Sequence, residues 1–160
     1  LKAYNLYLQQ SAVKRPLLIA DLKEEYIDFL LAQEGITNIK HHLYFPGYIS
    51  NNDLVTLYNA AFIFLYPSLR ESFGIPMLEA MACGTPIITG NISAMPEVAG
   101  NGVLTVDPFN PEDIANKVLQ LEQIPALYQQ QKNYGLKRVQ QFSWAKTAEE
   151  LLEVYQSIKI

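Results

Sequence analysis

Cysteine, histidine and basic residues are scarce in this sequence. Among 160 residues there are one cysteine, two histidines and 12 lysines plus arginines against 16 aspartates plus glutamates, which gives a formal charge of −4. The single cysteine, Cys83, excludes an internal disulfide and a cysteine-rich zinc cluster. So acidic a chain has no strongly positive field to attract a phosphate backbone, and nucleic acid is not an expected partner.

Long apolar runs are absent as well. No stretch approaches the ~20 apolar residues that span a bilayer, and the first residues do not resemble a signal peptide. These absences favour a cytoplasmic location. Apolar residues still make up 49% of the chain, which is enough to form one folded globular domain over residues 1–160.

Short apolar segments alternate with segments of helical periodicity along the chain. This alternation predicts an α/β fold, a doubly wound, Rossmann-like parallel sheet with helices on both faces. In such sheets ligands bind beyond the carboxyl ends of the strands, which directs attention to the loops at 21–23, 46–50, 67–74 and 90–96. Strands are predicted at 17–20, 42–45, 61–66, 86–89 and 103–106, and helices at 1–10, 22–33, 74–83, 110–122, 125–141 and 144–157, with another helix beginning after Ser50.

No group of residues has the spacing of a metal site. His41 and His42 are adjacent, and adjacent side chains on a strand point to opposite faces, so these two are not expected to share an ion. An Asp-rich metal motif is also missing from the sequence. We therefore expect no metal in the function of this chain.

The turn at Gly74 can bind an anion without a basic side chain. Gly74 and Pro76 indicate the start of a helix directly after a buried strand. The amides of Gly74, Ile75 and Met77 would then be unpaired, and the positive end of the helix dipole would lie beside them. Such a helix end is suited to phosphate oxygens.

Two carboxylates flank this turn. Glu79 lies about one turn into the helix, where it could accept hydrogen bonds from the hydroxyls of a ribose, and Glu71 precedes the turn, where it could accept them from a hexose. The spacing suggests a ligand composed of a sugar, a diphosphate and a ribose. In the alternative interpretation Glu71 pairs with Arg70 or caps the turn, and Glu79 is a solvated residue stabilised by the helix dipole.

Four segments resemble the signature of a known family. They are Pro67-Ser68, Glu71-Ser72-Phe73-Gly74-Ile75-Pro76, Glu79-Ala80-Met81-Ala82-Cys83-Gly84-Thr85-Pro86 and Met95-Pro96-Glu97-Val98-Ala99-Gly100. The chain is similar to retaining nucleotide-sugar glycosyltransferases of the GT-B fold, the group 1 or family 4 type. The resemblance implies that residues 1–160 are the C-terminal, donor-binding domain of a two-domain transferase of hexosyl groups.

The resemblance also implies roles for individual residues near the turn. Glu71 would contact the donor hexose as the catalytic residue, and the amides of Phe73 and Gly74 would hold the hexose hydroxyls. Ile75 would meet the diphosphate, and Glu79 would bind the ribose.

Other implied roles lie outside the turn. The loop Gly47-Tyr48-Ile49 would hold the base, and Glu97 would lie on the donor side. The leaving diphosphate itself would take the proton of the acceptor, so the protein would mainly position the donor and stabilise charge. The donor would be a GDP- or UDP-linked sugar, with a slight preference for guanosine and mannose from residues 91–98, and neither a cofactor nor a metal would be needed.

The sequence departs from the family pattern in two places. The family begins this domain with a strand and a Gly-Arg loop followed by a lysine, whereas this chain begins at Leu1 in the helix that comes next. A sheet of order 3-2-1-4-5-6 should then show a gap or an exposed edge, through which the chain could self-associate. In addition, Ala20-Asp21 replaces the glycine common after the second strand.

These departures shape the remaining expectations. We expect the isolated chain to be inactive, with a saccharide or lipid-linked acceptor bound by an N-terminal domain and with the full-length protein at the inner face of the membrane. Residues 144–157 form an amphipathic helix whose broad apolar face would be an exposed patch. The alternatives are a non-catalytic α/β nucleotide-binding or regulatory module, and a sugar-phosphate phosphorylase or epimerase of similar architecture.

Overall fold

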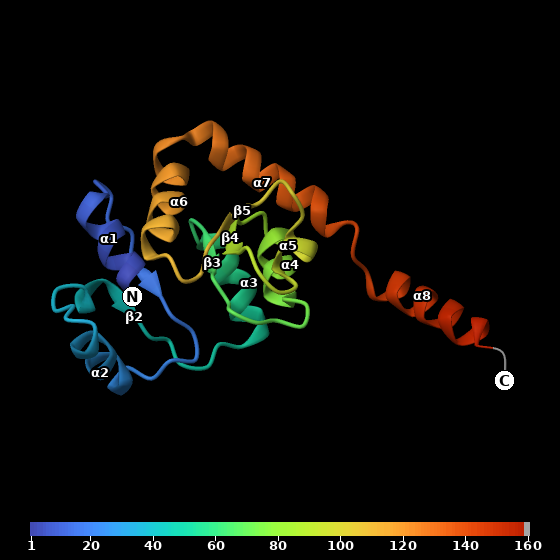
Figure 1. Cartoon of the computed structure of the whole chain (residues 1–160), viewed down its shortest axis with the longest axis horizontal. Coiled ribbons are helices and arrows are strands. Elements are labelled where there is room, and N and C mark those ends of the chain that lie inside the picture. The colour runs from blue at the N-terminus through green and yellow to red at the C-terminus, as the bar shows by residue number, and fades with distance from the viewer. Residues whose placement is uncertain (159–160) are drawn as a thin grey trace.

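Helices alternate with parallel strands in the computed structural model, which describes residues 1–158 (Figure 1). The order of the five predicted strands and seven predicted helices is confirmed, but the 3₁₀ turn Lys40–His42 and the short helix Met95–Ala99 were not predicted. The strands are β1 (Leu17–Leu18), β2 (Leu43–Tyr44), β3 (Phe64–Tyr66), β4 (Ile87–Gly90) and β5 (Leu104–Val106). The helices are α1 (Lys2–Gln10), α2 (Glu25–Gln33), the 3₁₀ turn η1 (Lys40–His42), α3 (Asn51–Ala60), α4 (Ile75–Ala82), α5 (Met95–Ala99), α6 (Pro111–Gln123), α7 (Pro125–Val139) and α8 (Trp144–Ser157).

The strands form two parallel sheets that are not joined to each other. β1 pairs with β2, and β3, β4 and β5 pair in that order. This arrangement follows the predicted doubly wound order with its gap, because β1 and β3 would flank the first strand of the family pattern. Among residues 1–158 no strand lies between them.

Several strands are shorter than the apolar runs predict. The run 61–66 contributes only Phe64–Tyr66 to β3, because Ala61 donates its amide to the carbonyl of Leu57 and so caps α3. Phe62 stacks on Tyr128 of α7 at a centroid distance of 4.8 Å. The first half of the run therefore packs against helices instead of pairing.

The histidine pair does not lie on a strand. His41 and His42 belong to the 3₁₀ turn η1, and their ring centroids are 4.1 Å apart. The prediction that they point to opposite faces of a strand is wrong, since Ile39 accepts the amide of His42 and closes a turn. Among residues 1–158 no three metal-binding side chains of His, Cys, Asp or Glu gather.

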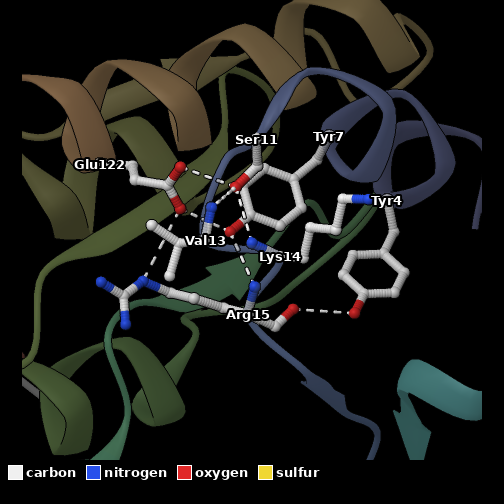
Figure 2. A network of polar contacts seen from close by, with 7 residues as sticks. All are labelled: Tyr4, Tyr7, Ser11, Val13, Lys14, Arg15 and Glu122. Carbon is white, nitrogen blue, oxygen red and sulfur yellow. Dashed lines mark hydrogen bonds and ion pairs between the residues drawn. The ribbon is translucent and has the colours of Figure 1, made fainter.

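A largely buried carboxylate connects α6 to the end of α1 (Figure 2). Glu122 accepts hydrogen bonds from the Tyr7 hydroxyl at 2.6 Å and from the Ser11 hydroxyl at 2.7 Å, and its side chain is only 8% exposed. The Arg15 guanidinium lies 3.8 Å from the same carboxylate. Tyr4 donates to the carbonyl of Arg15 at 2.8 Å. The network holds the connection from α1 to β1 in one conformation.

The same arginine bridges the gap between the two sheets at the amino ends of their strands. Arg15, two residues before β1, lies over the ring of Phe62, two residues before β3, with 4.0 Å from its guanidinium carbon to the ring centroid. This cation–π contact links β1 to β3 where backbone hydrogen bonds do not.

The core below the candidate site is formed by α4, α5 and β4. Met77, Met81 and Met95 are fully buried there, with Ile87 and Val98 beside them. α7 covers the outer side of α4, and its Gly135 lies against Met81, where an added Cβ would meet the Met81 Cγ at 3.2 Å. Helix α4, which carries Glu79, is therefore packed between this core and helix α7.

Helix α8 extends away from the rest of the molecule, as Figure 1 shows. None of its residues is buried, and Trp144, Leu152 and Tyr155 are more than half exposed. The predicted exposed apolar patch is thus confirmed. Within residues 1–158 no helix is long and apolar enough to cross a membrane.

We expect Glu122→Ala to lower the free energy of unfolding by about 3 kcal/mol, because the Tyr7 and Ser11 hydroxyls and the Arg15 guanidinium lose their shared acceptor. Gln120→Ala, at an exposed position of the same helix, should change it by less than about 0.5 kcal/mol. Urea denaturation of the two variants measures both effects, and equal losses would contradict the importance of the network.

Stability should also fall at alkaline pH. Burial, followed by the nearby Tyr7, raises the pKa of Tyr4 to about 12, so the folded state holds this proton more tightly than the unfolded state, where the pKa is about 10. The resulting stabilisation is complete below about pH 10 and is lost as the pH rises towards about 12. The urea midpoint should decline over that range, and it should decline less in Tyr4→Phe.

Candidate functional site

A glycine in the left-handed region starts helix α4 at the carboxyl end of β3. Gly74 has a φ of +95°, and a Cβ at this position would lie 2.7 Å from the Cε of Met77. Pro76 occupies the first turn, where its missing amide costs nothing. The predicted helix start is confirmed, and only glycine fits it without strain.

The amides at this helix end are only partly free. Met77 donates its amide to the carbonyl of Gly74 at 3.0 Å, so the prediction that this amide is unpaired is wrong. This hydrogen bond closes the turn at which the helix starts, so the Met77 amide is not available to a ligand. The amides of Gly74 and Ile75 donate to no acceptor within residues 1–158, and they are the groups that an anion at this position would meet.

The carboxylate of Glu71 is held by two hydroxyls. Its Oε1 accepts hydrogen bonds from the Tyr66 hydroxyl at 2.6 Å and from the Ser68 hydroxyl at 3.0 Å. Its Oε2 has no donor among residues 1–158, and no ion pair joins Glu71 to Arg70 in that part of the chain. The predicted alternative of a pair with Arg70 is therefore not observed, and one carboxylate oxygen stays open to a ligand.

Ser93 fixes the backbone of Glu71. The Glu71 amide donates to the Ser93 hydroxyl at 3.1 Å, and that hydroxyl donates to the Glu71 carbonyl at 2.8 Å. Ser93 itself has a φ of +59°, an unusual conformation for a residue other than glycine. The loops that follow β3 and β4 are thus tied together at Glu71.

Glu79 is connected to helix α3 through Tyr58. The hydroxyl of Tyr58, a residue only 6% exposed, donates to the Oε2 of Glu79 at 3.2 Å. Burial, and then the charge of Glu79, raises the pKa of Tyr58. Tyr58 meets Phe64 edge to face at 5.3 Å, and Phe64 stacks on Tyr66 at 5.4 Å. One row of aromatic rings therefore supports both carboxylates.

Phe73 and Ile75 lie at the surface of the turn. Phe73 is 41% exposed and meets Phe142 edge to face at 5.9 Å, and Ile75 is 44% exposed. Both residues are accessible to a ligand beside Gly74. The proposed contacts of their backbones with a donor stay predictions.

Glu97 lies on α5, which α7 holds in place. Arg138 donates to the carbonyls of Glu97 at 2.6 Å and Val98 at 3.0 Å, and the Tyr134 hydroxyl donates to the carbonyl of Ala99 at 3.3 Å. The last carbonyls of α5 are satisfied in this way. The Glu97 side chain is exposed and has no ion-pair or hydrogen-bond partner within residues 1–158.

The loop Gly47-Tyr48-Ile49 belongs to the other sheet. Gly47 has a φ of +70°, its carbonyl accepts the amide of Asp21 at 3.4 Å, and Tyr48 is 85% exposed. Asp21 adopts a φ of +57°, so it takes the conformation that a glycine would supply at this position. No hydrogen bond within residues 1–158 joins this loop to Glu71 or Glu79.

A hollow borders the loop 67–74. It has a volume of about 320 Å³ and is lined by Lys2, Pro67 and Pro108 among others, so it lies beside the carboxyl ends of β3 and β5. Lys2 forms an ion pair with Glu34 at 2.6 Å at its rim. A larger hollow of about 570 Å³ is lined only by residues of α7, and none of the predicted site residues contributes to it.

Sequence reasoning identified the two glutamates but not the residues that hold them. Tyr58, Tyr66, Ser68 and Ser93 make these contacts. Tyr66 and Ser68 could have been found, because Tyr66 is the last residue of β3 and Ser68 lies two residues further on, in the loop that carries Glu71. Ser93 and Tyr58 come from other elements, and the sequence contains no local signal for their contacts.

The family model that matches this chain and the two relatives compared with it are all glycosyl transferases. A family model described as "Glycosyl transferases group 1" matches residues 1–138. O-antigen chain mannosyltransferase B of Escherichia coli is 32% identical over 157 residues, which cover 97% of this chain and 41% of that protein. D-inositol 3-phosphate glycosyltransferase of Streptomyces bingchenggensis is 30% identical over 135 residues, which cover 83% of this chain and 29% of that protein. The chain thus spans less than half the length of either relative.

Solved structures share the fold. Sucrose-phosphate synthase of Thermosynechococcus elongatus has a TM-score of 0.79 at 24% identity and is matched over 97% of this chain and 41% of its own. The Anabaena protein Alr3699/HepE in complex with UDP has a TM-score of 0.78 at 18% identity, over 98% and 44%. The predicted Rossmann-like fold is therefore confirmed. Since the family match covers residues 1–138, this chain belongs to the group 1 glycosyl transferases.

Proposed function

We propose that residues 1–160 form the donor-binding domain of a retaining GT-B glycosyltransferase, and that the domain positions a nucleotide-diphosphate sugar for hexosyl transfer. The observation that carries this proposal is the geometry of Glu71. Its carboxylate is fixed at one oxygen and open at the other, directly before a helix start with two free amides. A fixed carboxylate can accept hydrogen bonds from ligand hydroxyls, and the neighbouring helix start can bind phosphate oxygens. Together they suit a ligand that contains both groups.

Each part of the donor has a place in this proposal. The diphosphate lies at the amides of Gly74 and Ile75, where the helix dipole favours negative charge. The hexose hydroxyls donate to Glu71, and the ribose hydroxyls donate to the exposed carboxylate of Glu79. The base lies on the loop Gly47-Tyr48-Ile49, where the exposed Tyr48 ring offers a stacking surface.

Charge development explains how this placement would promote transfer. As the glycosidic bond breaks, negative charge grows on the diphosphate and positive charge on the sugar ring. The amides and dipole of α4 stabilise the first, and the Glu71 carboxylate stabilises the second. The leaving diphosphate takes the proton of the acceptor, so the new bond forms on the face that it leaves. This scheme requires no metal and no further cofactor.

The relatives suggest the class of donor. Two similar proteins are named O-antigen chain mannosyltransferases, and we propose a mannosyl donor, linked to guanosine, in the synthesis of a polysaccharide. A uridine-linked sugar is the competing donor, since a protein of the same fold was solved with UDP.

The acceptor and the location also belong to this proposal. The chain covers 41% of the mannosyltransferase it resembles, so we place the saccharide or lipid-linked acceptor on a further domain, at the cytoplasmic face of the membrane. β1 and β3 each have an edge without a strand partner among the described residues 1–158, and a second copy of the isolated chain could add a strand there.

The donor class can be tested by calorimetric titration of the folded chain with guanosine, uridine and adenosine diphosphates and with their hexose conjugates. We expect guanosine diphosphate and its mannose conjugate to bind more tightly than the others by about tenfold, which corresponds to about 1.4 kcal/mol. Selective binding of uridine compounds would replace the proposed base. If a chain shown to be folded binds none of them, the donor site is wrong or incomplete.

The two glutamates should separate binding from turnover in the full-length enzyme. Glu79→Gln should weaken nucleoside diphosphate affinity by about tenfold, because it weakens charge-assisted hydrogen bonds to the ribose. Glu71→Gln should lower kcat by at least about tenfold and leave that affinity within about twofold.

Glu153→Gln, at an exposed position of α8, is the matched control and should change neither quantity. Equal effects of the Glu71 and Glu79 variants on diphosphate affinity would contradict the division of roles. A non-catalytic nucleotide-binding module would show no change in nucleotide-sugar binding for either variant.

A further inference from the structure

Glu71 is held by four hydrogen bonds, two on its side chain and two on its backbone. Its Oε1 accepts two hydroxyl donors, and its amide and carbonyl are both bound to Ser93. Its chain neighbours Arg70 and Ser72 are exposed, so packing does not fix this segment. A free glutamate side chain loses rotamer entropy on being ordered. The hydrogen bonds keep it ordered before any ligand arrives.

Of the two hydroxyls on Oε1, that of Tyr66 is the better placed. Its distance of 2.6 Å is the shorter, and the Ser68 hydroxyl also lies 3.4 Å from the carbonyl of Arg70, which competes for its single proton. A tyrosine hydroxyl that donates to a carboxylate makes a charge-assisted bond of the stronger kind. Tyr66 is therefore the principal donor to Glu71.

The ring of Tyr66 is anchored in the sheet, whereas Ser68 lies on the loop. Tyr66 is the last residue of β3, faces Thr89 in the register of β4, and accepts the Thr89 hydroxyl on its carbonyl at 3.1 Å. Its ring stacks on Phe64, and its Cε1 would lie 3.8 Å from a Cβ at Gly74. The hydroxyl thus emerges from a rigid position under the turn that starts α4.

We propose that Tyr66 is a positioning residue that fixes the Glu71 carboxylate by occupying Oε1, so that Oε2 alone is presented to the hexose of the donor. This inference rests on the proposed function and adds a residue to it. Tyr66 touches no substrate and acts only through Glu71. Ser93 holds the backbone of Glu71, so that its side chain can reach the Tyr66 hydroxyl. Ser68 is a second, weaker donor to the same carboxylate oxygen.

The protonation of Tyr66 is consistent with the role of a donor. Burial, and then the hydrogen bond to Glu71 and its charge, raises the pKa of Tyr66 to about 12. The hydroxyl therefore keeps its proton throughout the neutral range. Only above about pH 10, where a free tyrosine already ionises, would the donor begin to be lost.

The test uses the full-length enzyme and a double-mutant cycle between Tyr66→Phe and Glu71→Gln. Tyr66→Phe should lower kcat by about tenfold, the worth of one hydrogen bond to a charged group, and leave nucleoside diphosphate affinity within about twofold. In the Glu71→Gln background the same change should lower kcat by less than about twofold, because the carboxylate to be positioned is gone.

Tyr4→Phe is the matched control. It removes a tyrosine hydroxyl that donates to a carbonyl at 2.8 Å outside the site loops, and it should leave kcat within about twofold. The positioning role is overturned if Tyr66→Phe leaves kcat unchanged, or if it lowers kcat equally with and without the Glu71 carboxylate. Loss of diphosphate affinity parallel to the loss of kcat would also overturn it, since that indicates general damage to the site.

A measurement independent of activity separates this inference from the proposed function. In protein labelled with carbon-13 at tyrosine Cζ, the Tyr66 signal is assigned by its loss in Tyr66→Phe. Glu71→Gln should move the titration of that signal to lower pH, because the negative partner is removed. If the signal moves but no nucleotide sugar binds or reacts, the contact stands and the proposed function fails. If the signal does not move, the positioning of Glu71 by Tyr66 is refuted whatever the activity.

Discussion

The parallel register of β3 with β4 is the constraint on which the site depends. Tyr66 faces Thr89, and a hydrogen bond from the Thr89 hydroxyl to the Tyr66 carbonyl reinforces the pairing near the carboxyl ends of the two strands. The loops that follow must then leave the sheet side by side. Ser93, which lies four residues beyond Thr89, can for this reason reach both backbone groups of Glu71. A shift of one residue would turn Tyr66 to the other face and break the contact with Glu71.

Negative charges lie close together in the proposed site. The chain has a formal charge of −4, and two carboxylates flank the place proposed for a diphosphate. Backbone amides and the dipole of α4 provide positive potential there without a lysine or arginine. Hydroxyl donors from Tyr66 and Tyr58 stabilise the carboxylates from the protein side. Polar but uncharged donors thus keep the local charges in fixed places.

The fold and the two glutamates could be predicted from the sequence because they leave local signals. The order of the elements follows from periodicity, and the start of α4 follows from Gly74 and Pro76. The division of the sheet was predicted only through the family resemblance, since no local pattern specifies a missing neighbour. The free amide of Met77 was predicted wrongly, because the turn at Gly74 consumes it.

The contacts that hold the glutamates could not be predicted in this way. Tyr58 lies 21 residues from Glu79, and Ser93 lies 22 residues from Glu71. Each contact depends on how two elements pack, and a serine or tyrosine in a single sequence carries no sign of it. The histidine pair shows the same limit on a smaller scale, since the hydrogen bond from the His42 amide to the Ile39 carbonyl that closes its turn leaves no signal in the sequence.

Helix α3 is the connection between the two halves of the proposed donor site. The loops after β1 and β2 are joined by Asp21 and Gly47, and those after β3 and β4 by Glu71 and Ser93, yet the two sheets share no strand pairing within residues 1–158. α3 begins one residue after Ser50, whose hydroxyl caps it, and near its end Tyr58 reaches Glu79. A helix of its ten residues is about 15 Å long. The distance from the loop proposed to hold the base to Glu79, proposed to bind the ribose, is therefore set by a rigid helix. The proposed donor site requires that one nucleotide span this distance.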